Sequence, residues 1–101
     1  MKKNGVVNDG INIEASQGAP VKATENGVVV YTGQSIKSFG NLVLIKHKDG
    51  WVSAYGHLKE IRVKEGTSVK QGALLGTVGK TGYVDKPQLH FLNAPYLLLQ
   101  L

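Results

Sequence analysis

Thirteen glycines divide the 101 residues of the chain into short segments. The runs between them are rich in Val, Ile, Leu and Tyr, and apolar and polar positions alternate in them with a period close to two. This period is typical of strands, in which successive side chains point to opposite faces. No window of ten or more residues carries a convincing apolar period of 3.6. The pattern therefore predicts an all-β protein with little helix.

Seven short strands are expected at residues 20–23, 27–31, 42–48, 51–55, 68–70, 73–78 and 89–92. Asp49 and Gly50 separate the third strand from the fourth, and this dipeptide favours a type I′ hairpin turn. Within the third strand, His47 shares a face with Val43 and Ile45. A histidine at a hairpin end is more often hydrogen-bonded or at the surface than a ligand, so we expect a structural role for His47.

Chain length and composition limit the organisation further. A chain of this size buries one hydrophobic core, so residues 1–101 are expected to form a single domain. Without cysteine, a metal site must be built from Asp, Glu and the three histidines. We expect no transmembrane segment and no signal peptide, because Met1-Lys2-Lys3 is followed by Asn4 and not by an apolar stretch. The apolar residues 94–101 must pack on the core or on a partner.

The charge pattern argues against one class of partner. Lys and Arg outnumber Asp and Glu by 12 to 7, which gives a net charge of +5. The lysines are scattered from Lys2 to Lys86, and the single arginine, Arg62, stands among aliphatic residues. Nucleic-acid sites instead cluster Arg and Lys with aromatic residues between them. We therefore expect no nucleic-acid partner, whereas an anionic polymer such as cell-wall glycan-peptide is compatible with this charge.

Five ordered groups of motifs cover nearly the whole chain. They are residues 10–13, residues 20–23 with 26–29, residues 40–47, residues 54–58, and residues 79–82 with 87–91. In this order they resemble the lysostaphin-type zinc metallopeptidases, also called the LytM family, whose members cut peptide cross-links in the bacterial cell wall. The resemblance implies an all-β, single-domain antiparallel β-sandwich with an open groove.

The metal ligands of that family are the first point of departure. The resemblance implies a comparison with the active members of the family. In these, a zinc ion is held by the His and Asp of an opening His-x-Gly-x-Asp motif and by the second His of a closing His-x-His motif. Asn8 and Asn12 stand at the first two positions here, and His90 alone matches. A neutral carboxamide oxygen is a poor zinc ligand, and Asn12 also lacks the negative charge of an aspartate. We therefore expect no bound zinc and no other cofactor.

The catalytic positions depart as well. The Tyr-Gly-His-Leu segment keeps the family's catalytic histidine as His57, but Gln88 replaces the first histidine of the closing motif. Leu92 stands where many members have a glutamate. His57 and Gln88 are thus vestigial catalytic positions, and we expect that the chain is not an enzyme.

Degenerate members of the family suggest a different use of the groove. The chain resembles the NlpD/EnvC-like subgroup, whose members activate cell-wall amidases during bacterial division. This implies a regulator of amidases, or a peptidoglycan-binding module, in the bacterial envelope or periplasm. The expected partner-binding residues line the groove: Asn12, Tyr55, His57, Gln88 and His90.

Three alternatives are compatible with the same residues. A zinc-dependent peptidoglycan endopeptidase with an atypical metal site would need His57, His90 and a third donor such as Asp9, although strand alternation points Asp9 to the opposite face. A purely structural module would use none of these side chains. A lipoyl or biotinyl carrier domain, which residues 63–79 also resemble, would require acylation of Lys70 or Lys80.

Overall fold

The computed structural model describes residues 10–95, and every regular element in this range is a strand. The strands are β1 (Ile11–Glu14), β2 (Pro20–Lys22), β3 (Gly27–Gly33), β4 (Asn41–Lys46), β5 (Trp51–Ile61), β6 (Ser68–Val69), β7 (Leu74–Val78) and β8 (Gln88–Pro95). The expected all-β class is confirmed. Within residues 10–95, no helix is long and apolar enough to cross a membrane.

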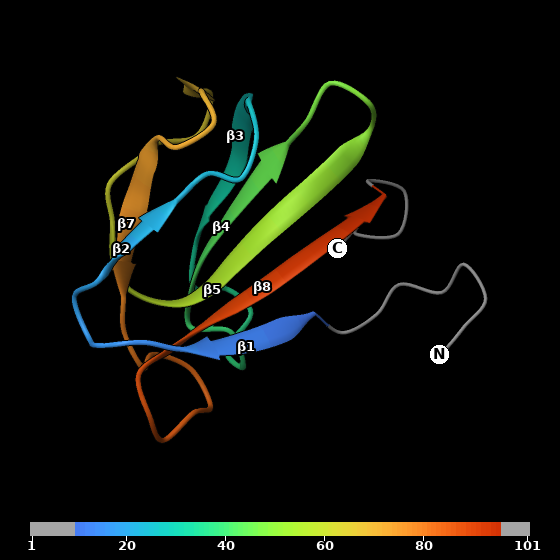
Figure 1. The fold of residues 1–101 in the computed structure, drawn as a ribbon. Helices are drawn as coiled ribbons and strands as arrows, with labels where there is room; N and C mark the ends of the chain where they lie inside the picture. Colours follow the sequence, from blue (N-terminus) through green and yellow to red (C-terminus); the bar gives the residue numbers. More distant parts are fainter. Residues whose placement is uncertain (1–9, 96–101) are drawn as a thin grey trace.

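All strand pairs are antiparallel, and the long strand β5 connects the two parts of the sheet. The larger part has the order β1-β8-β5-β4-β3-β6, with β5 between β8 and β4. The last residues of β5 instead pair with β7, which pairs with β2. In Figure 1, β2 and β7 form a small layer that lies across one face of the larger sheet. The fold is therefore the antiparallel two-layer arrangement that the motifs implied.

Both faces of the central strands are covered. The main core lies between the two layers and includes Val43 and Ile45 from β4, Tyr55 from β5 and Leu75 from β7. A smaller cluster on the opposite face contains Leu42, with residues of β5, β8 and the segment between β3 and β4. A strand covered on both faces reads as a continuous apolar run rather than an alternating one. This explains the uninterrupted Leu-Val-Leu-Ile sequence of β4.

The hairpin between β4 and β5 is present, but its turn differs from the expected type I′. The Gly50 N–H donates to the His47 carbonyl over 3.2 Å, and Gly50 has a φ of 87°. Asp49 is not in the positive-φ region, since His57 is the only non-glycine residue of the described part that is. The connection is therefore a type I turn followed by a left-handed glycine. Asp49 Oδ1 accepts from the Trp51 N–H over 3.3 Å, which favours this conformation.

The seven expected strands all occur, with shifted ends. Two features were missed. The first is β1, whose four residues are all exposed and which forms an edge of the sheet. The second is the half of β5 that follows Tyr55, where the positive φ of His57 interrupts the regular pleat. Of the apolar chain end expected at residues 94–101 to pack on the core or on a partner, Ala94 and Pro95 belong to β8 and Ala94 is fully buried. Residues 96–101 lie outside the described residues.

Candidate functional site

Strand pairing brings Asn12 and His90 together. The two residues are register partners on β1 and β8, and His90 is also the partner of Gly56 on β5. His90 Nδ1 lies 2.6 Å from Asn12 Oδ1. An amide oxygen only accepts hydrogen bonds, so Nδ1 of His90 carries the proton and donates. Asn12 is exposed and His90 is half-buried.

His57 is held in a left-handed backbone conformation, with a φ of 65° and only 4% of its surface exposed. Its N–H donates to the Phe39 carbonyl over 2.7 Å, and its carbonyl accepts from the Gly79 N–H over 3.1 Å. Its ring Nδ1 donates to the Thr81 carbonyl over 2.8 Å. A non-glycine residue persists in this region only where its surroundings fix it. The three hydrogen bonds supply that constraint and set the direction of the ring.

Two loops that position His57 approach each other closely through glycines. A Cβ on Gly40 would meet Thr81 Oγ1, and a Cβ on Gly82 would lie 2.7 Å from the Gly40 nitrogen. Both glycines also have positive φ angles, of 65° and 84° respectively. The Asn41 N–H donates to Thr81 Oγ1 over 3.0 Å, and the same hydroxyl donates to the Leu58 carbonyl over 2.8 Å. The two loops therefore lock the strand end that carries His57.

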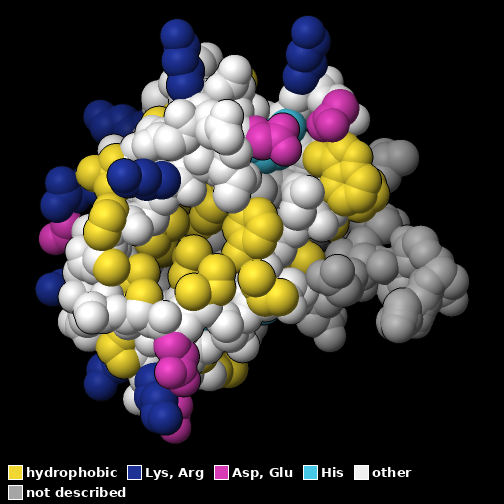
Figure 2. Space-filling model, in the orientation of Figure 1, with side chains coloured by type: hydrophobic (Ala, Val, Ile, Leu, Met, Phe, Trp, Pro, Cys, Tyr) yellow, Lys and Arg dark blue, Asp and Glu magenta, His cyan; other side chains and the backbone are white. Residues whose placement is uncertain are grey.

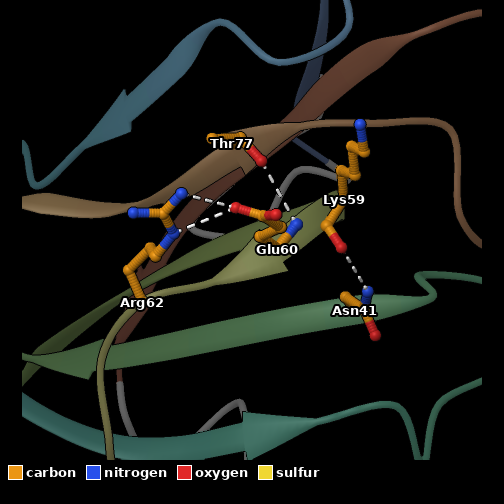
Figure 3. A network of polar contacts seen from close by, with 5 residues as sticks. All are labelled: Asn41, Lys59, Glu60, Arg62 and Thr77. Atoms are coloured by element: carbon orange, nitrogen blue, oxygen red, sulfur yellow. Dashed lines mark hydrogen bonds and ion pairs between the residues drawn. The ribbon is translucent and has the colours of Figure 1, made fainter.

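Further polar contacts fix the end of β5 beyond His57, and Figure 3 draws those among Asn41, Lys59, Glu60, Arg62 and Thr77. The Asn41 amide donates to the Leu58 carbonyl over 2.9 Å and to the Lys59 carbonyl over 3.3 Å. The Glu60 N–H donates to Thr77 Oγ1 over 3.2 Å. Arg62 donates to Glu60 Oε1 from Nε at 2.9 Å and from Nη2 at 2.7 Å. The hydrogen bonds with Arg62 and its positive charge lower the pKa of the exposed Glu60 carboxyl.

Phe39 joins the two histidines into an aromatic cluster. Its ring stacks on His90 at a centroid distance of 5.2 Å and an interplanar angle of 22°. It meets His57 edge-on at 6.5 Å, and the two imidazoles are 6.0 Å apart at 71°. His57 and His90 therefore face each other, as their expected placement in one groove implied. Sequence reasoning missed Phe39 and Thr81, although both stand next to glycines of the matched motifs.

Gln88 lies on the same side of β8 as His90, because residues two apart on a strand share a face. Its side-chain amide donates to the Lys86 carbonyl over 3.1 Å, and its N–H donates to the Gly79 carbonyl over 3.0 Å. Gln88 is half-buried. The structure thus gathers Asn12, His57, Gln88 and His90 in one region. Asn8 and Asp9 lie outside the described residues.

The structure contradicts the expected position of Tyr55 in the groove. Only 1% of its surface is exposed, and it belongs to the main core. Its hydroxyl accepts from the Thr24 N–H over 3.1 Å and is hydrogen-bonded to Ser53 Oγ over 2.9 Å. Successive residues of a strand lie on opposite faces of the sheet. Gly56 pairs with His90 and shares its face, so the Tyr55 side chain points to the other face. Tyr55 therefore cannot present its ring to a partner.

His47 has the structural role that the sequence favoured. It is 6% exposed, and its Nδ1 donates to the Asn26 carbonyl over 2.7 Å. Its Nε2 lies 2.8 Å from Ser53 Oγ, which continues the chain of hydrogen bonds to Tyr55. A buried polar side chain with both ring nitrogens bonded stabilises the core without needing a ligand.

The residues of the site do not fit a tetrahedral zinc centre. Within residues 10–95, no group of three or more His, Cys, Asp or Glu side chains is placed to hold a metal ion. Two ligands bound to one tetrahedral zinc ion are about 3.3 Å apart. The Asn12 and His90 atoms are 2.6 Å apart and are joined directly by a hydrogen bond. Asn12 also supplies no charge to offset a dication.

The fold and this arrangement of motifs define a lysostaphin-like peptidase domain with altered ligand positions. The structure aligns with the catalytic domain of lysostaphin from Staphylococcus simulans with a TM-score of 0.82 and 37% identity, over 85% of this chain and 65% of that chain. The family model described as Peptidase family M23 matches residues 6–94. The chain belongs to peptidase family M23.

Two curated relatives are described by names other than peptidase. Cell division protein DipM of Caulobacter vibrioides is 55% identical over 91 residues, which cover 90% of this chain and 15% of that protein. Murein hydrolase activator NlpD of Escherichia coli is 43% identical over 84 residues, which cover 83% of this chain and 22% of that protein. The chain thus spans less than a quarter of either relative.

Proposed function

We propose that the domain is a noncatalytic regulator that activates cell-wall amidases in the bacterial envelope. The observation that carries this proposal is the direct 2.6 Å hydrogen bond between Asn12 and His90. These two residues stand at two of the three positions that hold zinc in active members of the family. The names of the relatives, a murein hydrolase activator and a cell division protein, support the same class of role.

The chemistry of the side chains favours binding over hydrolysis. The carboxamide of Gln88 neither gains nor loses a proton near neutral pH, so it cannot serve as a general acid or base. His57 directs Nδ1 at the Thr81 carbonyl, and no carboxylate of the described part joins the two histidines. We infer that the site holds no zinc and that the domain does not cleave peptidoglycan.

The same side chains suit a protein partner. The exposed Asn12 amide and the half-buried Gln88 amide each offer donors and an acceptor for a partner's backbone. The Phe39 ring, half-buried beside the histidines, adds an apolar contact surface. We define the regulatory surface as Asn12, Phe39, Gln88 and His90, with the buried His57 packed beneath Phe39 and His90. On this proposal residues 1–101 act as one domain, and peptidoglycan is the alternative partner.

The test measures activation of a purified cell-wall amidase on dye-labelled peptidoglycan. Asn12→Ala and Gln88→Ala should reduce activation while the domain keeps its thermal midpoint. Asn93→Ala is the matched control, because Asn93 is also an exposed asparagine but lies on the opposite face of β8 from His90.

Three results would contradict the proposal in different ways. Release of dye by the domain alone would indicate an enzyme with an atypical metal site. Binding to peptidoglycan without any effect on the amidase would indicate a binding module. Loss of activation in Asn93→Ala but not in Asn12→Ala or Gln88→Ala would place the functional surface on the other face.

A further inference from the structure

Strand β1 is an open edge of the larger sheet. It pairs with β8 on one side, and no strand within residues 10–95 pairs with its other side, which forms the lower edge of the sheet in Figure 1. In an antiparallel edge strand, every second residue directs its N–H and C=O away from the sheet. All four residues of β1 are exposed. The edge therefore presents backbone donors and acceptors in the arrangement that an additional strand would use.

The other edges of the fold carry features that discourage an additional strand. β2 begins at Pro20, ends at Lys22 and has an irregular register before Lys22. β6 has only two residues, and where β3 extends beyond it the Glu65 carboxylate accepts from the Thr32 N–H over 3.3 Å. Proline, lysine, short length and bulges commonly protect edge strands. β1 has no proline, no lysine and no shift in its register with β8.

One face of β1 is apolar and uncovered. Ile11 and Ile13 share this face and are 58% and 44% exposed. Their register partners on β8 are Phe91 and Leu89, which pack against the main core. Figure 2 shows hydrophobic side chains gathered near the centre of one face of the molecule, with Lys and Arg side chains around its margin. The two isoleucines thus continue the apolar layer of the core to the edge of the sheet.

The other face of β1 continues the regulatory surface. Asn12 lies on this face as a member of that surface, and Glu14 is the next residue of β1 on the same side. Glu14 is exposed, and the salt bridge found among residues 10–95 joins Glu60 to Arg62 and does not involve it. The Glu14 carboxylate can therefore pair with a cation from outside the domain.

We propose that an extended segment of the amidase adds to β1 as a further strand of the sheet. This inference rests on the proposed function, because β1 contributes Asn12 to the regulatory surface. The segment places apolar side chains beside Ile11 and Ile13 on one face and a Lys or Arg beside Glu14 on the other, since apolar and opposite-charge neighbours stabilise paired strands. Main-chain hydrogen bonds supply affinity in such an addition, and the alternating side chains supply selectivity.

Hydrogen–deuterium exchange of the intact chain, with and without a purified cell-wall amidase, tests strand addition directly. The β1 amides that point away from β8 should exchange about tenfold more slowly in the complex, because each gains a hydrogen bond. β6 lies at the opposite edge of the sheet and is the control segment, whose exchange should not change.

Charged substitutions test the two faces of β1 separately. Ile13→Lys places a charge in the apolar row and should weaken amidase binding by about tenfold. Val30→Lys is its matched control, because Val30 is a β-branched residue of β3 with a similar exposure of 39%. Glu14→Lys should weaken binding more at low salt than at high salt, because it repels the basic side chain of the segment. Glu25→Lys, at an exposed glutamate outside β1, is the control for net charge.

The outcomes distinguish this inference from the proposed function. Activation by the wild type without added protection of β1, or equal losses of binding in the edge variants and their controls, would overturn strand addition and leave the amidase-activating role intact. Absence of activation by the wild type would overturn both. A dimer that Ile13→Lys abolishes would show that a second copy of the chain occupies the edge, and it would overturn the assignment to the amidase. Protection of β1 without the amidase, lost when residues 96–101 are removed, would overturn it in favour of the chain's own end.

Discussion

Asn12 Oδ1 and His90 Nδ1 are 2.6 Å apart across the β1–β8 pair, closer than two ligands of one tetrahedral zinc ion can be. The hydrogen bond needs an acceptor on β1 and a proton on the imidazole, and both conditions hold without a metal. With an aspartate at position 12, the same two strands would direct a charged oxygen at that nitrogen. The carboxamide keeps the hydrogen bond to the imidazole but removes the negative charge that a zinc ion would need at this position.

Restoring the ligands should restore metal affinity. The double variant N8H/N12D is expected to raise the zinc content from well below one ion per chain towards one, because an imidazole and a carboxylate join His90. Elemental analysis of protein purified without chelator measures this directly. Adding His90→Ala to the double variant should remove the gain. Stoichiometric zinc in the unmodified protein would contradict the prediction.

Hydrolysis should not return with the metal alone. Gln88 replaces one catalytic histidine of the family, so we expect the double variant to bind zinc with little cleavage of cross-linked peptidoglycan. Gln88→Ala would not help, whereas Gln88→His added to the double variant should increase the cleavage rate.

A chelator should leave the stability of the unmodified domain unchanged. A ligand stabilises a folded protein only in proportion to its binding, and the described donor set does not fit zinc. The thermal midpoint measured with and without EDTA is the test. A clear decrease with EDTA, reversed by added zinc, would show that a metal site exists.

The sequence predicted every strand except β1 and the second half of β5, and it predicted most of the motif residues, but not which face each side chain takes. The Asp49-Gly50 dipeptide between two apolar runs predicted the hairpin, and the motif order predicted that His57 and His90 would line one groove. Residues two apart share a face of a regular strand, which would place Tyr55 beside His57. The φ of 65° at His57 breaks the pleat, so the two side chains separate and Tyr55 stays in the core. Phe39 and Thr81 were missed because they act from loops, whose positions depend on the close approach of Gly40 and Gly82.

Tyr55 should contribute to stability through its hydroxyl. Tyr55→Phe removes a partner from the Thr24 N–H and from Ser53 Oγ in a buried region, and we expect a loss of about 1–3 kcal/mol in the free energy of unfolding. Tyr83→Phe is the matched control, because Tyr83 is 75% exposed and its change should stay within about 0.5 kcal/mol. Chemical denaturation measures both. Equal effects of the two changes would contradict the role of the buried hydroxyl.

Core truncation should cost more. Ile45 is fully buried between the two layers, and Ile45→Ala is expected to lower the free energy of unfolding by about 2–4 kcal/mol through lost burial and a residual cavity. Ile11→Ala removes the same atoms from a side chain that is 58% exposed, and it should change stability by less than about 0.5 kcal/mol. A similar cost at both positions would mean that the exposed β1 face is covered in solution.

The Glu60–Arg62 pair should give stability a small dependence on acid pH. Arg62 lowers the pKa of Glu60 in the folded protein, so the ionised pair stabilises the fold above the ordinary glutamate pKa. This contribution is lost as the pH falls through the lowered pKa. Wild-type protein should therefore be slightly more stable than Glu60→Gln near neutral pH, and the difference should disappear in acid.

Both side chains of the Glu60–Arg62 pair are about half exposed, so added salt should also reduce the difference in stability. Glu25→Gln, another exposed glutamate, is the control for a general charge effect. Denaturation curves measured across the acid range would contradict the pairing if the difference between wild type and Glu60→Gln grew as the pH fell.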